Sequence, residues 1–214
     1  MDKPSVFILG AGGHAKVLLD CLSLNKNITI RGILDINQLL HGKSILGFPV
    51  IGSEDEILKN YFLSSIQLVN GIGSVKTTSQ RENIFNKFKN IGYHFLNVIH
   101  PTSYVGQEVI LGEGVQVMAG STIQAGSRIG DNVIVNTHAV VDHDCVIEDH
   151  VHLAPGVVCC GNVTIGRGTH VGSGAVILQG INIGPNCLIA AGAVVTRDVV
   201  AVSKVAGIPA RIME

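Results

Sequence analysis

The stretch VDHDCV-IEDHVH-LAPGVV-CCGNVT-IGRGTH (residues 141–170) consists of five consecutive units of six residues, each beginning with an apolar residue. The same phase holds from residue 105 to residue 200 without an insertion. Fifteen of the sixteen first positions are aliphatic, and the exception is the small apolar Cys159. The sixteen residues are Val105, Leu111, Val117, Ile123, Ile129, Val135, Val141, Ile147, Leu153, Cys159, Ile165, Val171, Ile177, Ile183, Ile189 and Val195.

A period of six fits neither an α-helix nor a freely alternating strand. It fits short parallel strands that are joined by tight corners, with one aliphatic residue per face pointing inward. Glycine occupies the second position of the unit at 106, 112, 130, 166, 172 and 184, which we interpret as places where the backbone must turn. Three faces make a coil of eighteen residues, so the sixteen units predict slightly more than five coils of a parallel β-helix.

The first hundred residues follow a different pattern. An apolar run at residues 6–9 precedes a glycine-rich turn and a helical stretch at 16–24, and further strands are expected at 28–34 and 66–69. Helical stretches at 54–60 and 78–90 alternate with them, which indicates a small parallel α/β sheet. We therefore predict a Rossmann-like α/β domain over residues 1–97, a β-helix over 98–200, and a tail over 201–214 that leaves the coil.

Composition excludes several classes of protein. The formal net charge of −1 and the lack of a long Lys/Arg run argue against a nucleic-acid partner. No apolar run approaches the roughly 20 residues that a membrane span needs, and no signal-peptide cleavage site follows the N-terminus. The five cysteines are odd in number and form no C-x-x-C pair, so we expect reduced thiols and a cytoplasmic protein.

The first motif is Gly10-x-Gly12-x-x-Ala15, which follows a strand and opens a helix, with Asp35 at the end of the second strand. This arrangement places backbone N–H groups against a phosphate and a carboxylate near a ribose or base. Read literally, the motif indicates NAD, although the domain has only half the length of a full dinucleotide fold. Binding of another nucleotide phosphate is our preferred interpretation, and a turn that needs glycine only for packing is the alternative. Gly73, after a later strand, could line the same site.

The second motif is Asp142-His143-Asp144, which interrupts a bland repeat of Val, Gly and Ala. His143 is the third residue of its unit, a position not directed into the core. The adjacent Asp144 could orient the imidazole and stabilise its protonated form. Residues eighteen apart stack on successive coils, so Gly161 lies over His143 and offers a backbone N–H as an oxyanion donor. The alternative is an incidental surface histidine.

Other histidines leave rival interpretations open. His152 stacks beneath His170, and the pair could form a polar ladder on a solvent face. A zinc site would characterise a β-helical zinc lyase, and a β-helical binding scaffold is a further alternative. The histidines that could contribute to such a site are His138, His143, His150, His152 and His170.

Four motifs together resemble those of the bacterial nucleotide-sugar N-acetyltransferases of the hexapeptide-repeat family, to which the sialic acid O-acetyltransferases are similar. The motifs are Gly-Ala-Gly-Gly-His-Ala at 10–15, Val-Ile-His-Pro at 98–101, Val-Asp-His-Asp-Cys at 141–145 and Gly-Ile-Pro-Ala-Arg at 207–211. The resemblance implies a left-handed β-helix, acetyl-CoA as co-substrate, a nucleotide-linked amino sugar as acceptor and a homotrimer. Acetylation of a hydroxyl on a sialic-acid-like sugar is the alternative.

The resemblance also implies roles for individual residues. His143 would be the general base and Asp144 would tune its basicity, in a direct transfer that needs no metal and no cysteine nucleophile. The residues expected to contact acetyl-CoA are His152, Gly161, Ser173 and Ala191. Those expected to contact the nucleotide sugar are Gly12, Gly13, His14, Asp35, Gly73 and Asp142.

Overall fold

The computed structural model describes residues 3–213, so Met1, Asp2 and Glu214, at the ends of the expected ranges 1–97 and 201–214, lie outside the described residues. The chain forms two compact units, and each is described by itself. The first extends to Gly73 and includes Asn83–Val98, whereas the second comprises Ser74–Glu82 and the chain from Ile99 onward.

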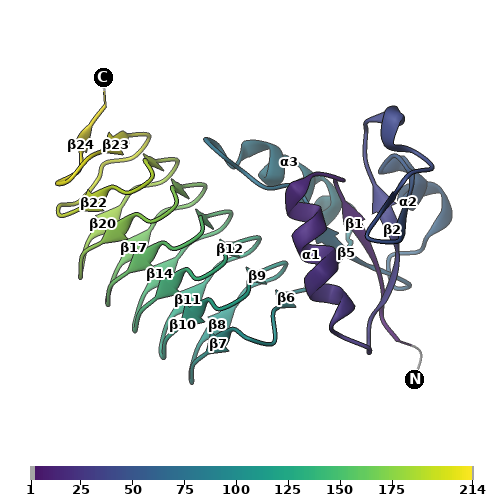
Figure 1. Cartoon of the computed structure of the whole chain (residues 1–214), viewed down its shortest axis with the longest axis horizontal. Coiled ribbons are helices and arrows are strands. Elements are labelled where there is room, and N and C mark those ends of the chain that lie inside the picture. Colours follow the sequence, from purple (N-terminus) through teal and green to yellow (C-terminus); the bar gives the residue numbers. More distant parts are fainter. Residues whose placement is uncertain (1–2, 214) are drawn as a thin grey trace. The chain divides into compact units, whose positions relative to one another are not determined.

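The first unit is an α/β fold, as predicted (Figure 1). The helix after the glycine-rich turn begins at residue 13, three residues before its predicted start at 16. The elements are β1 (Ser5–Leu9), α1 (Gly13–Ser23), β2 (Thr29–Leu34), the 3₁₀ helix η1 (Gln38–Leu40), β3 (Ser44–Ile45), β4 (Phe48–Gly52), α2 (Asp55–Asn60), β5 (Gln67–Asn70) and α3 (Ser79–Ile91), whose first turn belongs to the second unit.

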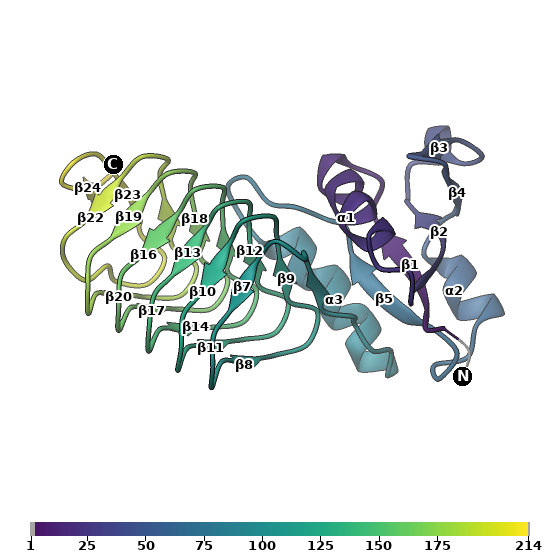
Figure 2. The same ribbon diagram turned by 60° about the horizontal axis from the view of Figure 1, so that its bottom comes forward.

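The five strands of this unit form one sheet in the order β3-β4-β2-β1-β5, which Figure 2 shows with α1 alongside β1. β1 pairs in parallel with β2 and with β5. Its apolar run, residues 6–9, is at most 1% exposed, because a strand covered on both faces must be apolar throughout. β3 and β4 form an antiparallel hairpin that the sequence did not predict.

The second unit is a three-sided parallel β-helix of two-residue strands, stacked in Figure 1 from β7 to the C-terminal strands. The first face contains β7 (Tyr104–Val105), β10 (Thr122–Ile123), β13 (Val140–Val141), β16 (Val158–Cys159), β19 (Val176–Ile177) and β22 (Val194–Val195). The second contains β8 (Ile110–Leu111), β11 (Arg128–Ile129), β14 (Val146–Ile147), β17 (Thr164–Ile165) and β20 (Asn182–Ile183). The third contains β6 (Val98–Ile99), β9 (Gln116–Val117), β12 (Ile134–Val135), β15 (His152–Leu153), β18 (His170–Val171), β21 (Leu188–Ile189), β23 (Lys204–Ala206) and β24 (Arg211–Ile212).

Residues eighteen apart pair between successive coils, for example Val141 with Cys159, which confirms the predicted coil length. The first-position residues point inward, and from Val117 to Val195 each is at most 2% exposed. Together with the apolar residues of the fifth position they form one continuous apolar core. At about 25 cal/mol per Å² of apolar surface removed from water, this column is the main favourable contribution to the folding of the coil.

The second-position glycines have a different structural role from the one that we predicted. The left-handed backbone conformation falls on the fourth position of the unit, from Glu108 to Gly192, and eight of these fifteen residues are glycine. The second-position glycines have no positive φ; an added Cβ at Gly106 would lie 2.8 Å from the backbone nitrogen of Ala125 on the next coil. They are therefore required by close stacking of coils and not by a turn.

Residues 201–213 do not leave the coil, which corrects the predicted tail over 201–214 for its described part. β23 pairs in parallel with β21, and β24 folds back antiparallel on β23. Val205 is 4% exposed and lies in the core cluster, so this segment covers apolar side chains at the end of the column. An uncovered last coil would expose both apolar surface and unpaired backbone groups.

Candidate functional site

In the first unit, the turn between β1 and α1 lies where the strand order reverses, since β2 flanks β1 on one side and β5 on the other. In open α/β sheets this position, at the carboxyl ends of the strands, is where ligands bind. Gly12 is the N-cap of α1 and makes no side-chain cap, and Gly13 is the first helical residue. Both are exposed, and a Cβ built on either would meet no atom within 4 Å beyond its own helix and chain neighbours, so the surface at the start of α1 is open.

The segment after β5 packs against the same turn. A Cβ at Gly73 would lie 3.2 Å from the Cβ of His14, and one at Gly71 would lie 3.0 Å from that of Ala15. The structure therefore brings Gly12, Gly13, His14 and Gly73 together, as expected for residues that line one site.

Asp35 has a different environment from the one we expected. One carboxylate oxygen accepts a hydrogen bond from the Ala11 N–H at 2.7 Å, and the other accepts one from the Asn37 N–H at 2.8 Å. Its carboxylate thus braces the glycine-rich turn. A contact between Asp35 and a nucleotide remains a prediction.

In the second unit, Asp142, His143 and Asp144 form the corner between β13 and β14. Asp144 has φ +58°, the left-handed conformation of the fourth position, which Asp tolerates better than most residues. The corner directs both side chains outward: the His143 side chain is 51% exposed and that of Asp144 59% exposed. His143 Nδ1 lies 2.8 Å from Asp144 Oδ2, and the His143 N–H donates to Asp142 Oδ1 at 2.8 Å.

The electrostatics of this corner favour a charged imidazole. The hydrogen bond to Asp144 is the largest cause that raises the pKa of His143, and the negative charges of Asp142 and Asp144 raise it further. Partial desolvation is the second-largest cause and lowers the pKa of His143, but the net shift of this pKa is upward. Since an ionised carboxylate only accepts hydrogen bonds, Nδ1 carries the proton, and Nε2 is the nitrogen that can take up another.

Gly161 lies over the imidazole on the next coil, as the stacking predicted. A Cβ built on Gly161 would lie 2.5 Å from His143 Nε2, so only glycine leaves room for the ring. Among the described residues, no group accepts a hydrogen bond from the Gly161 N–H. A proton acceptor and an available backbone donor therefore lie side by side.

The residues predicted to contact acetyl-CoA occupy two environments. Ser173 and Ala191 are exposed and stack on successive coils, at the corner that follows the third face. His152 lies on that face and is only 5% exposed. Its Nδ1 is 2.6 Å from the Ser74 hydroxyl and its Nε2 is 3.1 Å from the Asn136 amide nitrogen. Its role toward acetyl-CoA remains a prediction.

His152 and His170 do pair on successive coils, with ring centroids 5.0 Å apart and ring planes at 87°, but they do not form a ladder on a solvent face. Both are 5% exposed, and the Ser74 hydroxyl lies 3.2 Å from His170 Nδ1 as well as close to His152. Burial lowers the pKa of His170, which favours its neutral form. The sequence did not indicate this cover, because Ser74 lies far from both histidines along the chain.

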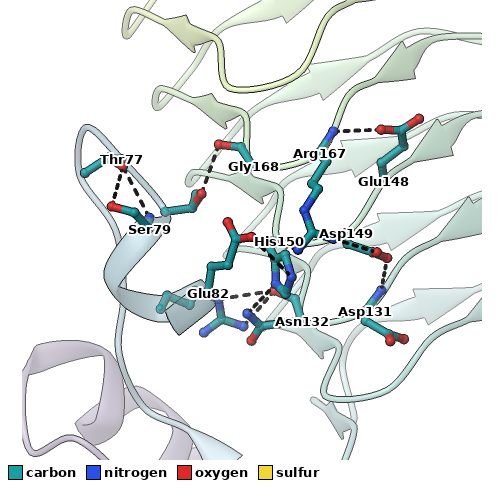
Figure 3. A network of polar contacts seen from close by, with 12 residues as sticks. Thr77, Ser79, Glu82, Asp131, Asn132, Glu148, Asp149, His150, Arg167 and Gly168 are labelled. Carbon is teal, nitrogen blue, oxygen red and sulfur yellow. Dashed lines mark hydrogen bonds and ion pairs between the residues drawn. The ribbon is translucent and has the colours of Figure 1, made fainter. Parts of the chain in front are cut away.

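The segment Ser74–Glu82 is held on the coil by a polar network (Figure 3). The Thr78 hydroxyl donates to the Gly168 carbonyl at 2.9 Å, and Arg81 donates from Nε and Nη2 to the Asn132 carbonyl at 3.2 and 3.0 Å. Arg81 is fully buried, and desolvation lowers its pKa to about 9, which still leaves it protonated at pH 7. These contacts fix Ser74 over the two histidines.

Within residues 3–213, no group of three or more His, Cys, Asp or Glu side chains is arranged to hold a metal ion. The five cysteines are free. Within the same residues, no helix has the length and apolar character that crossing a membrane requires.

The fold and the corner histidine define a hexapeptide-repeat transferase. The N-terminal domain model of PglD matches residues 5–88, and the model of six bacterial transferase hexapeptides matches residues 126–161 and 162–197. This match identifies the β-helix as left-handed, as the resemblance implied.

GDP-perosamine N-acetyltransferase from Escherichia coli O157:H7 is 31% identical over 167 residues, which cover 74% of this chain and 71% of that protein. Two solved structures are similar over nearly their whole length. The acetyltransferase domain of PglB from Neisseria gonorrhoeae has a TM-score of 0.90 at 33% identity, covering 99% of this chain and 100% of that one. PerB from Caulobacter crescentus, in complex with CoA and GDP-perosamine, has a TM-score of 0.89 at 37% identity, covering 98% and 97%. The chain belongs to this family of hexapeptide-repeat acetyltransferases with a PglD-type N-terminal domain.

Proposed function

We propose that the chain transfers the acetyl group of acetyl-CoA to the amino group of a nucleotide-linked amino sugar, with His143 as general base. The observation that carries this proposal is the His143 corner in a chain of this family. The imidazole is exposed, is bonded to a carboxylate through Nδ1, and presents Nε2 beside the N–H of Gly161.

The reaction follows from these groups. An ammonium ion is not a nucleophile, so the acceptor reacts as the neutral amine, after its ammonium form has released a proton to water. The amine nitrogen must then lose one N–H proton as the amide bond forms. Nε2 of His143 takes this proton, and Asp144 stabilises the imidazolium that forms. The amine nitrogen bonds to the thioester carbon, the Gly161 N–H stabilises the oxyanion, and the C–S bond then breaks. The imidazolium returns the proton to the CoA thiolate.

The first unit supplies the features that a nucleotide diphosphate needs. The N-terminus of α1 has no side-chain cap, so its first N–H groups and the helix dipole are available to an anion. Gly12, Gly13, His14 and Gly73 would line this site, and Asp35 would hold the turn in shape. Asp142, beside the base, would face the sugar.

We infer a homotrimer in which the site lies between subunits. His143 lies at the corner that follows the first face, whereas Ser173 and Ala191 lie at the corner that precedes it. The two corners are opposite edges of one protomer. Acetyl-CoA that contacts Ser173 and Ala191 would reach His143 of a neighbouring copy. Mixing His143→Ala subunits with Ala191→Trp subunits should then restore part of the activity, and no restoration would contradict a shared site.

The free cysteines suit a reducing compartment, and we infer a cytoplasmic enzyme, which cell fractionation would test.

The substrate is tested by incubating the protein with acetyl-CoA and a panel of GDP- and UDP-linked 4-amino sugars while free thiol release is followed. Release that depends on one amino sugar supports the proposal and identifies the nucleotide. Release only with a sialic-acid-like sugar that offers hydroxyl groups would instead establish O-acetylation. A protein that binds no acetyl-CoA would contradict both.

A further inference from the structure

One hydroxyl group on the coil before the His143 corner forms hydrogen bonds to both ends of that corner. Ser127 is fully buried, and its Oγ donates to the Asp142 carbonyl at 2.8 Å. The same oxygen accepts a hydrogen bond from the Cys145 N–H at 3.1 Å. Asp142 and Cys145 are the first and last residues of the corner that presents His143 and Asp144, so a single side chain closes it.

The same bridge occurs at a second corner. Thr169 donates from Oγ1 to the Gly184 carbonyl at 2.9 Å and accepts from the Cys187 N–H at 3.0 Å. Both hydroxyls occupy the fifth position of a unit and bridge residues fifteen and eighteen positions ahead. The corner at Gly184–Cys187 contains no titratable pair like His143 and Asp144, so it provides an internal comparison.

Gly126, next to Ser127, leaves space for the carboxylate of the pair. It has φ +76°, and a Cβ built on it would lie 2.6 Å from Asp144 Oδ1. Gly180 lies at the same edge of the coil with φ +71°, and no atom lies within 4 Å of its Cβ position. Any side chain at either residue strains the backbone similarly, but only at Gly126 does it also displace Asp144.

We propose that Ser127 and Gly126 are positioning residues for acetyl transfer: they hold the Asp142–Cys145 corner so that Asp144 stays bonded to His143. The proposal rests on the proposed role of His143. The charged groups that act on the imidazole are Asp142 and Asp144, and the residues stacked on it from the neighbouring coils, Ala125 and Gly161, are uncharged. A shift in the corner therefore changes the proton affinity of His143 chiefly through these two carboxylates.

The first test compares Ser127→Ala with Thr169→Ala. Both variants lose the same two hydrogen bonds, so both should lower the melting temperature by similar amounts. Ser127→Ala alone should lower kcat, by about 10-fold to 100-fold for a misplaced base, with KM for both substrates unchanged. It should also move the NMR titration of His143, and the acid limb of the pH profile of kcat/KM, to lower pH. Ser127→Thr, which keeps the hydroxyl, should behave like the wild type.

The second test compares Gly126→Ala with Gly180→Ala. Gly126→Ala should move the His143 titration to lower pH, whereas Gly180→Ala should not, although both should lose stability through backbone strain. This pair of variants tests whether the corner is held in position for Asp144 and His143 even if Ser127→Ala does not fold.

An unchanged His143 titration in both Ser127→Ala and Gly126→Ala would overturn the proposal and leave the bridge as a brace of the coil. Full activity of His143→Ala would refute the proposed base. Because the NMR titration does not depend on turnover, it would still decide whether Ser127 and Gly126 position the pair.

Discussion

Two corners of the β-helix carry charged residues and use them differently. At the His143 corner, both members of the pair are more than half exposed and bond mainly to each other. At the corner that follows the second face, which we call the Arg167 corner, Asp149 accepts from the Asp131 N–H at 2.8 Å and from Arg167 at 3.1 Å. Arg167 also pairs with Glu82 at 2.7 Å.

The difference shows which charges are available for chemistry. At the Arg167 corner, Asp149 accepts a hydrogen bond from a backbone N–H of the neighbouring coil, and Arg167 donates to Glu82 of the segment Ser74–Glu82 (Figure 3). At the His143 corner, glycine on the coil above leaves the imidazole open to a ligand. The presence of charged residues therefore does not identify the site. The candidate site is the corner whose charged side chains are exposed and bond mainly to each other.

The largest effect should follow removal of the base. His143→Gln should lower kcat by about 10² to 10⁴-fold, the range typical of general-base catalysis. Acetyl-CoA affinity and melting temperature should remain near wild type, because the side chain is exposed. His100→Gln is the matched control, since that ring bonds to Thr102 at the first corner of the coil. Equal rates for the two variants in a CoA-release assay would contradict the role of the His143 corner as the catalytic site.

Gly161→Ala should have the next largest effect, about 100-fold in kcat/KM, because its methyl group must displace the imidazole. The backbone N–H remains, so the loss reports on the position of His143. A crystal structure of the variant should show the ring moved away from Asp144. Unchanged turnover with the ring in place would argue against the stacking account.

The six-residue repeat explains why the β-helix and the position of His143 could be predicted from the sequence. Each first-position residue must be inward, so the phase of the pattern alone placed His143 outside the core and under Gly161. The contacts of the segment Ser74–Glu82 with the β-helix were not predicted, because the segment is polar and aperiodic and its partners lie more than fifty residues away along the chain. The burial of His152 was missed for the same reason, since it depends on that segment.

Asp144→Asn should lower kcat/KM by about 10-fold and shift the NMR titration of His143 to lower pH. The sign follows from the cause: the carboxylate raises the pKa of His143, so a neutral amide lets the imidazolium lose its proton more readily. Asn tolerates the left-handed conformation at this position. Asp149→Asn, at the Arg167 corner, is the control and should leave the titration in place; a shift in both would mean a general change in charge.

The smallest effect should come from Arg167→Ala, which removes ion pairs to Glu82 and Asp149. Arg167 is 42% exposed, so the expected loss in unfolding free energy is about 1 kcal/mol or less, with kcat unchanged. Urea unfolding and the CoA-release assay measure the two quantities. A drop in kcat without loss of stability would show that the Arg167 corner also serves the reaction.

The glycine-rich turn illustrates the remaining limit of sequence reasoning. Its pattern predicted a strand, a turn and a helix at a phosphate site, and the fold and the packing of Gly73 against His14 fit that site. The spacing of Asp35 predicted a carboxylate near a ribose or base, yet one of its oxygens accepts from the Ala11 N–H in the turn and the other accepts from the Asn37 N–H. Spacing along the chain could not show which backbone groups that carboxylate would meet.

The pH dependence of kcat/KM, measured beside the NMR titration of His143 in the wild type and in Asp144→Asn, tests the central claim most directly. If His143 is the general base, the acid limb of the rate profile coincides with the His143 titration, and the two move together to lower pH in the variant. An acid limb that stays in place while the titration of His143 moves would assign the proton transfer to another group.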